Sequence, residues 1–230
     1  MKGNLGTPRD PIERALKSAA ARYNGLHPRY RWYARLKYSD PCYRAIAQHV
    51  ERDSFTVDLG TGLGMLPVLL GVLGERRRAL GVDWDTEKMR AGLHAARGLP
   101  DVELIEGDLH VSELPSCDVI TLVDVLHYYD ADRQEALLKR CRAALKPGGR
   151  LLIREGDAAR GGAARWTRAV ERWVTQLGWN RGPAVRFRPM SELRTTLVGL
   201  GFRVDEDEMS GPLHPGNVLL VAQREEQRQA

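Results

Sequence analysis

Residues 57–64 read Val57-Asp58-Leu59-Gly60-Thr61-Gly62-Leu63-Gly64, with glycine at every second position from 60 onward. The pattern predicts a short buried strand over residues 54–57 and a helix over residues 63–73. Glycine lacks a Cβ and adopts positive φ easily, so a ligand can approach the backbone of such a turn closely. A strand, a glycine turn and a helix N-terminus are typical of nucleotide sites, although an ordinary βα loop is the alternative.

The spacing of these glycines indicates which nucleotide could bind. A dinucleotide fingerprint, Gly-x-Gly-x-x-Gly, would require glycine at position 65, where the chain has Met65. Asp58 instead places a carboxylate just before the turn, where it would repel a pyrophosphate. The same carboxylate suits a ligand that carries a sulfonium and an α-ammonium group. The ligand with that chemistry is S-adenosylmethionine.

Beyond the turn, apolar runs alternate with helical patterns. Strands are predicted over residues 78–83, 102–106, 118–123 and 150–154, with helices over 86–97 and 131–145. This alternation predicts a parallel sheet with right-handed crossovers, in which ligands bind at the carboxyl ends of the strands. Four of the strands end at an acid, namely Asp58, Asp83, Asp108 and Asp124. Four acids at one edge of the sheet predict a nucleotide site more strongly than the glycine turn does.

Two of these acids have expected partners on the ligand. Asp83 lies about twenty positions after the glycines, where nucleotide folds bind the ribose. A carboxylate there can accept hydrogen bonds from both ribose hydroxyls. Asp108, at the end of the next strand, could accept a hydrogen bond from the adenine amino group.

The last part of the chain predicts two more strands. A helix is expected over residues 191–198, followed by strands over 200–204 and 217–222. The short connection between these strands favours a hairpin, so the last strand should be antiparallel. The turn of this hairpin, which contains His214, would then lie at the ligand-binding edge. The predicted fold class is α/β, with seven strands between two helical layers.

The chain is divided into three predicted parts. Residues 1–50 are expected to form a helical cap over the cofactor site, residues 51–225 the binding domain, and residues 226–230 a polar tail. An aromatic and basic stretch within the cap offers Tyr33 and Tyr38 as candidates for the substrate pocket. Packing of these rings between the helices and the sheet edge is the alternative.

Residues 157–190 form a predicted insertion on the substrate side of the binding domain. Trp166 belongs there to an amphipathic helical stripe, which could either cover the acceptor or pack into the core. Together with the cap, this insertion would determine which acceptor binds.

Composition narrows the class of protein. Hydrophobic residues make up 43% of the 230 residues, and the longest apolar run, residues 65–73, is too short to span a bilayer. The first residues lack the apolar core of a signal peptide, so a cytoplasmic location is expected. The net charge of +5 could suit an anionic partner, but the basic residues are dispersed without an RNA-binding motif, so nucleic-acid binding is not expected. The three cysteines have neither metal-ligand nor disulfide spacing.

Together these motifs resemble the class I S-adenosylmethionine-dependent methyltransferases. The resemblance covers residues 50–225, and the matching segments, in the order and spacing of that family, are residues 57–64, 81–83, 107–108, 124–127 and 145–153. It implies a three-layer Rossmann-like sheet of seven strands with the last one antiparallel. It also implies S-adenosylmethionine as cofactor and S-adenosylhomocysteine as product.

The resemblance assigns roles to individual residues of the cofactor site. Asp58, Gly60 and Gly62 would hold the methionine end of the cofactor, and Asp83 the ribose. Asp108 with Leu109 would hold the adenine, while the backbone around Asp124 and Val125 would flank the sulfonium. The whole predicted cofactor set is Asp58, Gly60, Thr61, Gly62, Gly64, Asp83, Trp84, Asp108, Leu109, Asp124 and Val125.

Two narrower likenesses concern the acceptor. Residues 154–157 and 217–222 look like those of methyltransferases from bacterial aryl-polyene and related lipid or polyketide pathways. Residues 125–127 and 146–149 are similar to those of quinone C-methyltransferases. These likenesses imply O- or C-methylation of an aromatic, polyketide or lipid-like small molecule, free or linked to an acyl carrier, in secondary metabolism.

The candidate base is His127, just after the fourth predicted strand. Methyl transfer is an in-line displacement with a good leaving group, so catalysis depends mainly on positioning and on exclusion of water. A base is needed only if the acceptor must lose a proton, and histidine titrates near neutrality. Packing within the loop is the alternative for His127. His214 and Glu155 are further base candidates, and Tyr128 could shape the acceptor pocket.

No metal is expected in this site. Metal-dependent catechol-type methylation uses an acid after the fourth strand and an Asp-Asn pair after the fifth, where this chain has Glu155-Gly156-Asp157. Two other classes stay open. An RNA methyltransferase would usually carry an Asn-Pro-Pro-Tyr type segment in place of residues 124–127, and a non-catalytic protein would bind the cofactor without methylating anything. The sequence gives no indication of oligomeric state.

Overall fold

A seven-stranded sheet forms the centre of the computed structural model, which describes residues 10–157, 188–209 and 217–225. The strands are β1 Phe55–Leu59, β2 Arg78–Asp83, β3 Val102–Glu106, β4 Cys117–Val123, β5 Leu145–Gly156, β6 Phe202–Glu208 and β7 Asn217–Arg224. Their order is β3-β2-β1-β4-β5-β7-β6. The pairs among the first five strands are parallel, and β7 is antiparallel to both β5 and β6. The predicted fold class and the antiparallel last strand are confirmed.

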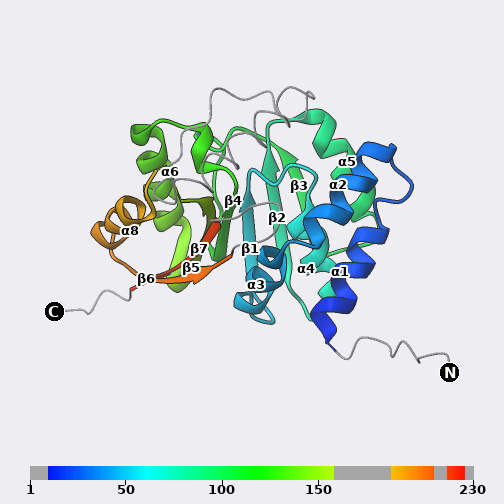
Figure 1. The fold of residues 1–230 in the computed structure, drawn as a ribbon, viewed down its shortest axis with the longest axis horizontal. Coiled ribbons are helices and arrows are strands. Elements are labelled where there is room, and N and C mark those ends of the chain that lie inside the picture. The colour runs from blue at the N-terminus through cyan, green and yellow to red at the C-terminus, as the bar shows by residue number, and fades with distance from the viewer. Residues whose placement is uncertain (1–9, 158–187, 210–216, 226–230) are drawn as a thin grey trace.

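Helices cover both faces of the sheet (Figure 1). They are α1 Pro11–Ala21, α2 Pro28–Tyr38, α3 Pro41–His49, α4 Met65–Leu73, α5 Thr86–Ala96, α6 Ala131–Ala144 and α8 Met190–Gly199, with the short turn η1 Leu126–Tyr128. Helices α1 to α5 share one hydrophobic cluster with the sheet, and α6 and α8 share another. Along β2, Ala79 belongs to the first cluster and Leu80 to the second. Successive strand residues point to opposite faces, so the fold has three layers.

The N-terminal cap consists of α1, α2 and α3. Each of these helices has proline in its first turn, where the missing N–H costs no hydrogen bond. The residues just before them, Asp10, His27 and Asp40, each accept a hydrogen bond from a backbone N–H of the first turn. The stretch that the sequence marks only as aromatic and basic is therefore the middle helix of the cap.

Several element boundaries differ from the predictions, and three of these differences have a clear structural cause. Helix α4 begins at Met65 rather than at 63, because Gly64 precedes it in a left-handed conformation with φ of 68°. Strand β5 begins at Leu145 rather than at 150, because Leu145 pairs with Cys117 across an irregularity in β4. Strand β6 continues to Glu208 because it pairs with β7 along its whole length.

Some predicted features lie outside the described residues. They are the helical stripe of Trp166 with most of the insertion, the hairpin turn of His214, and the tail at 226–230. Within the described ranges, no helix is long and apolar enough to cross a membrane.

Candidate active site

The glycine turn joins β1 to α4. Gly60, Gly62 and Gly64 have φ of 75°, 56° and 68°, values that strain any residue with a Cβ. A Cβ on Gly60 would lie 2.5 Å from the side chain of Val125, whereas one on Gly62 would meet the side chain of Lys88 at 3.9 Å. Packing against the loop after β4 therefore requires glycine at position 60. At Gly62 the turn leaves room for a ligand to reach the backbone.

Asp58 lies buried at the end of β1, and both of its carboxylate oxygens accept hydrogen bonds. The hydroxyl of Thr61 donates to one oxygen at 2.6 Å, and the hydroxyl of Thr121 donates to the other at 2.5 Å. Burial raises the pKa of Asp58 to about 6, although the two hydroxyls act in the opposite direction. The carboxylate thus connects Thr61 of the glycine turn with Thr121 of strand β4.

Stability is expected to depend on the ionisation of Asp58. Its pKa is about 6 in the folded protein against an ordinary 3.8. Between about pH 4 and pH 6 the native state therefore retains a proton that the unfolded chain releases, so stability falls as the pH rises, by about 3 kcal/mol in all. Asp58→Asn keeps the shape and can still bond both hydroxyls, so it should abolish this fall. Urea unfolding at about pH 4 and about pH 7 measures the difference.

Asp118 provides a control of opposite sign. Partial burial acts to raise its pKa, but the hydrogen bond and charge of Lys146, together with the hydrogen bond from the N–H of Phe55, outweigh burial and lower the pKa. Relative to wild type, Asp118→Asn is therefore expected to lose stability as the pH rises, because it lacks a carboxylate that folding favours in the ionised form. If wild type and Asp58→Asn showed the same dependence on pH, the effect of burial at Asp58 would be refuted.

Asp83 closes the glycine turn from the neighbouring strand β2. One oxygen accepts from the N–H of Gly62 at 2.7 Å, and the other accepts from the N–H of Asp85 at 2.9 Å. A carboxylate offers about four acceptor positions, so Asp83 retains capacity for two further donors such as ribose hydroxyls. Trp84 follows Asp83 in the chain, with 52% of its surface exposed.

The loop after β3 lies next to the end of β2. The N–H of Gly107 donates to the carbonyl of Asp83 at 2.9 Å. Asp108 is exposed and accepts from the N–H of His110 at 2.8 Å, while Leu109 is buried. The fold therefore brings the predicted cofactor residues of β1, β2 and β3 to the same edge of three adjacent strands.

Asp124, at the end of β4, is the centre of an ion-pair network that sequence reasoning missed. Its backbone has φ of 58°, and its carboxylate accepts from the ammonium group of Lys37 at 2.8 Å and from the guanidinium of Arg154. Arg154 is only 1% exposed and also pairs with Asp40 at 2.7 Å. Burial acts to lower the pKa of Lys37, yet the charge and hydrogen bond of Asp124, together with Tyr33, outweigh burial and the pKa rises. The network is therefore a charged quartet of two cations and two anions.

His127 and Glu155 form a second buried pair on the same loop. One oxygen of Glu155 accepts from the backbone N–H groups of Val125 and Leu126 at 2.9 and 2.7 Å, and the other lies 2.7 Å from Nδ1 of His127. Gln134 of α6 donates to the carbonyl of Leu126 at 3.0 Å. The sequence offered His127 and Glu155 as separate candidates, and the structure joins them.

Successive residues of β5 thus hold the loop after β4 from two sides. Arg154 and Glu155 point to opposite faces of the strand, the first to Asp124 and the second to the turn that carries His127. A signal for Arg154 was present in the sequence, since a charged residue inside an apolar strand requires a partner. No comparable signal in the sequence indicated Lys37, Asp40 or Gln134.

The tyrosines predicted for the substrate pocket differ in their surroundings. Tyr38 is buried among other rings, and its hydroxyl donates to the carbonyl of Met65 at 2.7 Å, which supports the packing alternative. Tyr33 is half-buried, with the ammonium group of Lys37 at 5.9 Å from its ring centroid. Tyr128 is half-buried, and its ring centroid lies 4.2 Å from that of His127.

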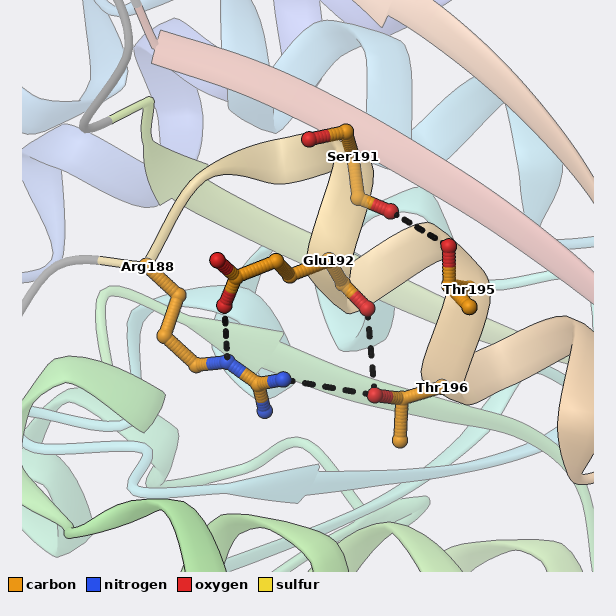
Figure 2. Close-up of a pocket in the computed structure, with 5 residues that line it drawn as sticks. All are labelled: Arg188, Ser191, Glu192, Thr195 and Thr196. Atoms are coloured by element: carbon orange, nitrogen blue, oxygen red, sulfur yellow. Dashed lines mark hydrogen bonds and ion pairs between the residues drawn. The ribbon is translucent and has the colours of Figure 1, made fainter.

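A surface pocket of about 350 Å³ lies at helix α8, and Figure 2 shows the residues that line it. Its lining residues are Arg188, Ser191, Glu192, Thr195 and Thr196. Arg188 donates to the hydroxyl of Thr196 at 3.3 Å and pairs with Glu192 at 3.7 Å, so these polar groups bind one another. Because this lining contains no residue of the predicted cofactor set, we place the candidate site at the strand ends instead.

Among residues 10–157, 188–209 and 217–225, no group of three or more His, Cys, Asp or Glu side chains is arranged to hold a metal ion.

Three curated proteins are similar to about half of this chain. Acetylserotonin O-methyltransferase of Mus musculus is 36% identical over 116 residues, which cover 50% of this chain and 29% of that protein. Ribosomal protein L11 methyltransferase of Thermus thermophilus is 37% identical over 111 residues, 48% of this chain and 41% of that protein. Carboxy-S-adenosyl-L-methionine synthase of Pseudomonas aeruginosa is 33% identical over 118 residues, 47% and 48% of the two chains. The chain spans less than half the length of these relatives.

Solved structures with low sequence identity share the fold. An O-methyltransferase family protein from Burkholderia thailandensis has a TM-score of 0.67 at 20% identity, over 95% of this chain and 72% of that one. The pyocyanin biosynthetic protein PhzM has a TM-score of 0.65 at 21% identity, over 94% and 62% of the two chains.

The sequence pattern of the O-methyltransferase domain matches residues 54–192, from the start of β1 into α8. This match includes the glycine turn, the acids at the strand ends and the His127–Glu155 pair. It covers more than half of the chain, and the chain therefore belongs to the O-methyltransferase domain family.

Proposed function

We propose that this chain transfers a methyl group from S-adenosylmethionine to a hydroxyl oxygen of a small-molecule or carrier-linked acceptor. The observation that carries the proposal is the buried pair of His127 and Glu155, joined at 2.7 Å just after β4. The pair follows Val125, which packs against Gly60 of the glycine turn. Methylation of a hydroxyl oxygen requires loss of its proton, and a base next to the cofactor turn can accept it.

The residues at the sheet edge fit S-adenosylmethionine, which family membership implies. The turn is open at Gly62, and Asp83 retains acceptor positions within reach of that turn. When bound, the cofactor would supply an electrophilic methyl group on its sulfonium. Asp58, Asp83 and Asp108 would hold its methionine, ribose and adenine parts, with the backbone at Asp124 and Val125 beside the sulfonium.

His127 is suited to accept the proton of the acceptor. Nδ1 of His127 faces the carboxylate of Glu155, which can only accept a hydrogen bond, so we assign the ring proton to Nδ1. This assignment leaves the lone pair of the imidazole on Nε2. When Nε2 takes up a proton, the resulting imidazolium lies against the negative charge of Glu155, which stabilises it.

Glu155 is itself held in place by the loop that it orients. Glu155 accepts hydrogen bonds from the backbone N–H groups of Val125 and Leu126, which directly precede His127. The carboxylate cannot rotate away from the imidazole without losing both hydrogen bonds. The pair and its turn therefore form one rigid unit, as a positioned base requires.

The experiment that tests this function combines binding and transfer. Calorimetry with S-adenosylhomocysteine measures cofactor binding, and labelled S-adenosylmethionine reports transfer to hydroxylated aromatic compounds, to carrier-linked acyl chains and to RNA. NMR of the product distinguishes an O-methyl ether from a C-methyl group. A C-methylated product would contradict the proposal, and so would methylated RNA. Cofactor binding without transfer to any acceptor would favour a non-catalytic role.

Asp83→Ala is expected to raise the Kd for S-adenosylhomocysteine by at least about tenfold, because each lost hydrogen bond to a charged group is worth about 1.5–3 kcal/mol. Calorimetry checks the change. Asp85→Ala is the control, because Asp85 caps α5 through the N–H of Glu87 but has no predicted contact with the ribose. An unchanged Kd for Asp83→Ala would overturn the ribose assignment.

A further inference from the structure

The end of helix α2 contacts both loops of the candidate cofactor site. Lys37 pairs with Asp124, in the loop after β4, at 2.8 Å. The next residue, Tyr38, donates its hydroxyl to the carbonyl of Met65, directly after the glycine turn, at 2.7 Å. Two consecutive residues of the cap thus reach the two loops on either side of the position predicted for the sulfonium.

Two further contacts strengthen this connection. The hydroxyl of Tyr23, from α1, donates to the carbonyl of Leu63 at 2.9 Å, so tyrosines of the cap bind the carbonyls on both sides of Gly64. Asp40, at the start of α3, pairs with Arg154 of β5 at 2.7 Å. These groups are buried or nearly so, which makes their partners hard to replace with water.

The other end of α2 contacts a third element of the same edge. The hydroxyl of Tyr30 donates to Glu87 at 2.6 Å, in the first turn of α5, which follows Asp83 and Asp85. Figure 1 shows α2 beside α5. The helix therefore spans from the ribose side of the predicted site to the loop after β4.

We propose that Lys37 and Tyr38 are positioning residues that couple docking of the N-terminal cap to cofactor binding. This inference rests on the proposed function for the identity of the cofactor. Lys37 and Asp40 belong to the cap, whereas Asp124 and Arg154 belong to the sheet, so the charged quartet is complete only while the cap is docked. A docked α2 fixes the separation of the glycine turn and the loop after β4, and a ligand held by both loops requires that separation.

Thermodynamic linkage makes the coupling reciprocal. If docking of α2 improves the affinity for the cofactor, binding of the cofactor must stabilise the docked α2 by the same factor. A residue that only supports the fold would lower the stability of α2 equally with and without ligand. The two cases are therefore separable by measuring α2 with and without S-adenosylhomocysteine.

The binding experiment compares Lys37→Met with Arg31→Met, an exposed cation on the same helix. Lys37→Met is expected to raise the Kd for S-adenosylhomocysteine about tenfold, and Arg31→Met to leave it within about twofold. Lys37→Arg, which keeps the charge, should restore most of the affinity. Tyr38→Phe removes a single hydroxyl and keeps the packing, so it tests the other loop even if Lys37→Met folds poorly.

Hydrogen exchange of the α2 amides supplies the second readout. In the wild type, S-adenosylhomocysteine should slow this exchange, and in Lys37→Met most of the slowing should be lost. Equal Kd values for S-adenosylhomocysteine in the wild type, Lys37→Met and Tyr38→Phe would overturn the coupling and leave the proposed function standing. Hydrogen exchange in α2 that does not change when ligand is added would have the same consequence. If the wild type did not bind S-adenosylhomocysteine, the proposed function would fail first, and the coupling with it.

Discussion

His127→Ala is expected to lower kcat for methylation of a hydroxyl acceptor by at least about 100-fold, the usual range for a general base being about 10²–10⁴. The Kd for S-adenosylhomocysteine should stay within about threefold of the wild type, because His127 contributes to proton removal and not to the predicted cofactor contacts. Steady-state kinetics and calorimetry measure the two quantities. The effect should fall on kcat, since the base acts in the transition state.

Glu155→Gln tests the same pair with almost no change in shape. The amide oxygen can still accept from the N–H groups of Val125 and Leu126, but the amide NH₂ would then face Nδ1 of His127. That arrangement moves the ring proton to Nε2 and removes the lone pair that the reaction needs. We expect a loss of kcat comparable to that of His127→Ala.

His49→Ala is the control for this pair, because it removes a histidine that pairs with Asp207 of β6 and belongs to no part of the predicted site. It should retain most of the activity. If His127→Ala and Glu155→Gln both kept wild-type kcat with an O-methylated product, the assignment of His127 as base would be refuted. The fold and the family assignment would remain.

Arg154→Leu is expected to destabilise the protein by about 3–5 kcal/mol, the usual cost of removing one partner from a buried ion pair. The substitution leaves the carboxylates of Asp40 and Asp124 without their shared guanidinium in a largely buried site. For a chain of this size the loss corresponds to a decrease in Tm of roughly 6 °C or more. Urea unfolding and thermal denaturation measure it.

The control is Arg150→Leu, four residues earlier on the same face of β5. Arg150 is 30% exposed and pairs with Glu51 at 3.0 Å, so its removal should cost less than about 1 kcal/mol. Replacing Asp40 and Asp124 by asparagine in the Arg154→Leu background should recover part of the loss, because the cost arises from uncompensated charge. Equal losses for Arg154→Leu and Arg150→Leu would contradict the buried network.

Sequence patterns succeeded where the signal is local. The turn between β1 and α4 needs glycine at positive φ, and the acids follow their strands directly, so covalent spacing alone aligns them at one edge. The start of β5 was missed for the opposite reason. Residues 146–149 carry the Pro and Gly typical of a helix stop, yet the pairing of Leu145 with Cys117 extends the strand through them.

The pairs that complete the site join residues far apart in the chain. His127 and Glu155 are 28 positions apart, Lys37 and Asp124 are 87 apart, and Asp40 and Arg154 are 114 apart. Asp124 illustrates the difference between a local sequence signal and a contact made across the fold. Its position at a strand end was predicted, whereas the engagement of its side chain with two cations depends on a cap helix whose docking the sequence pattern does not show.

The sequence by itself determined the order of strands and helices, the glycine turn that organises the cofactor edge, and the acids beside it. These features follow from periodicity and from backbone conformations that only particular residues adopt. The tertiary structure decided which side chains meet: the carboxylate that orients His127, the guanidinium that holds Asp124, and the tyrosines of the cap that bind the turn. Such contacts depend on the packing of layers and on the register between distant strands, which no short stretch of sequence encodes.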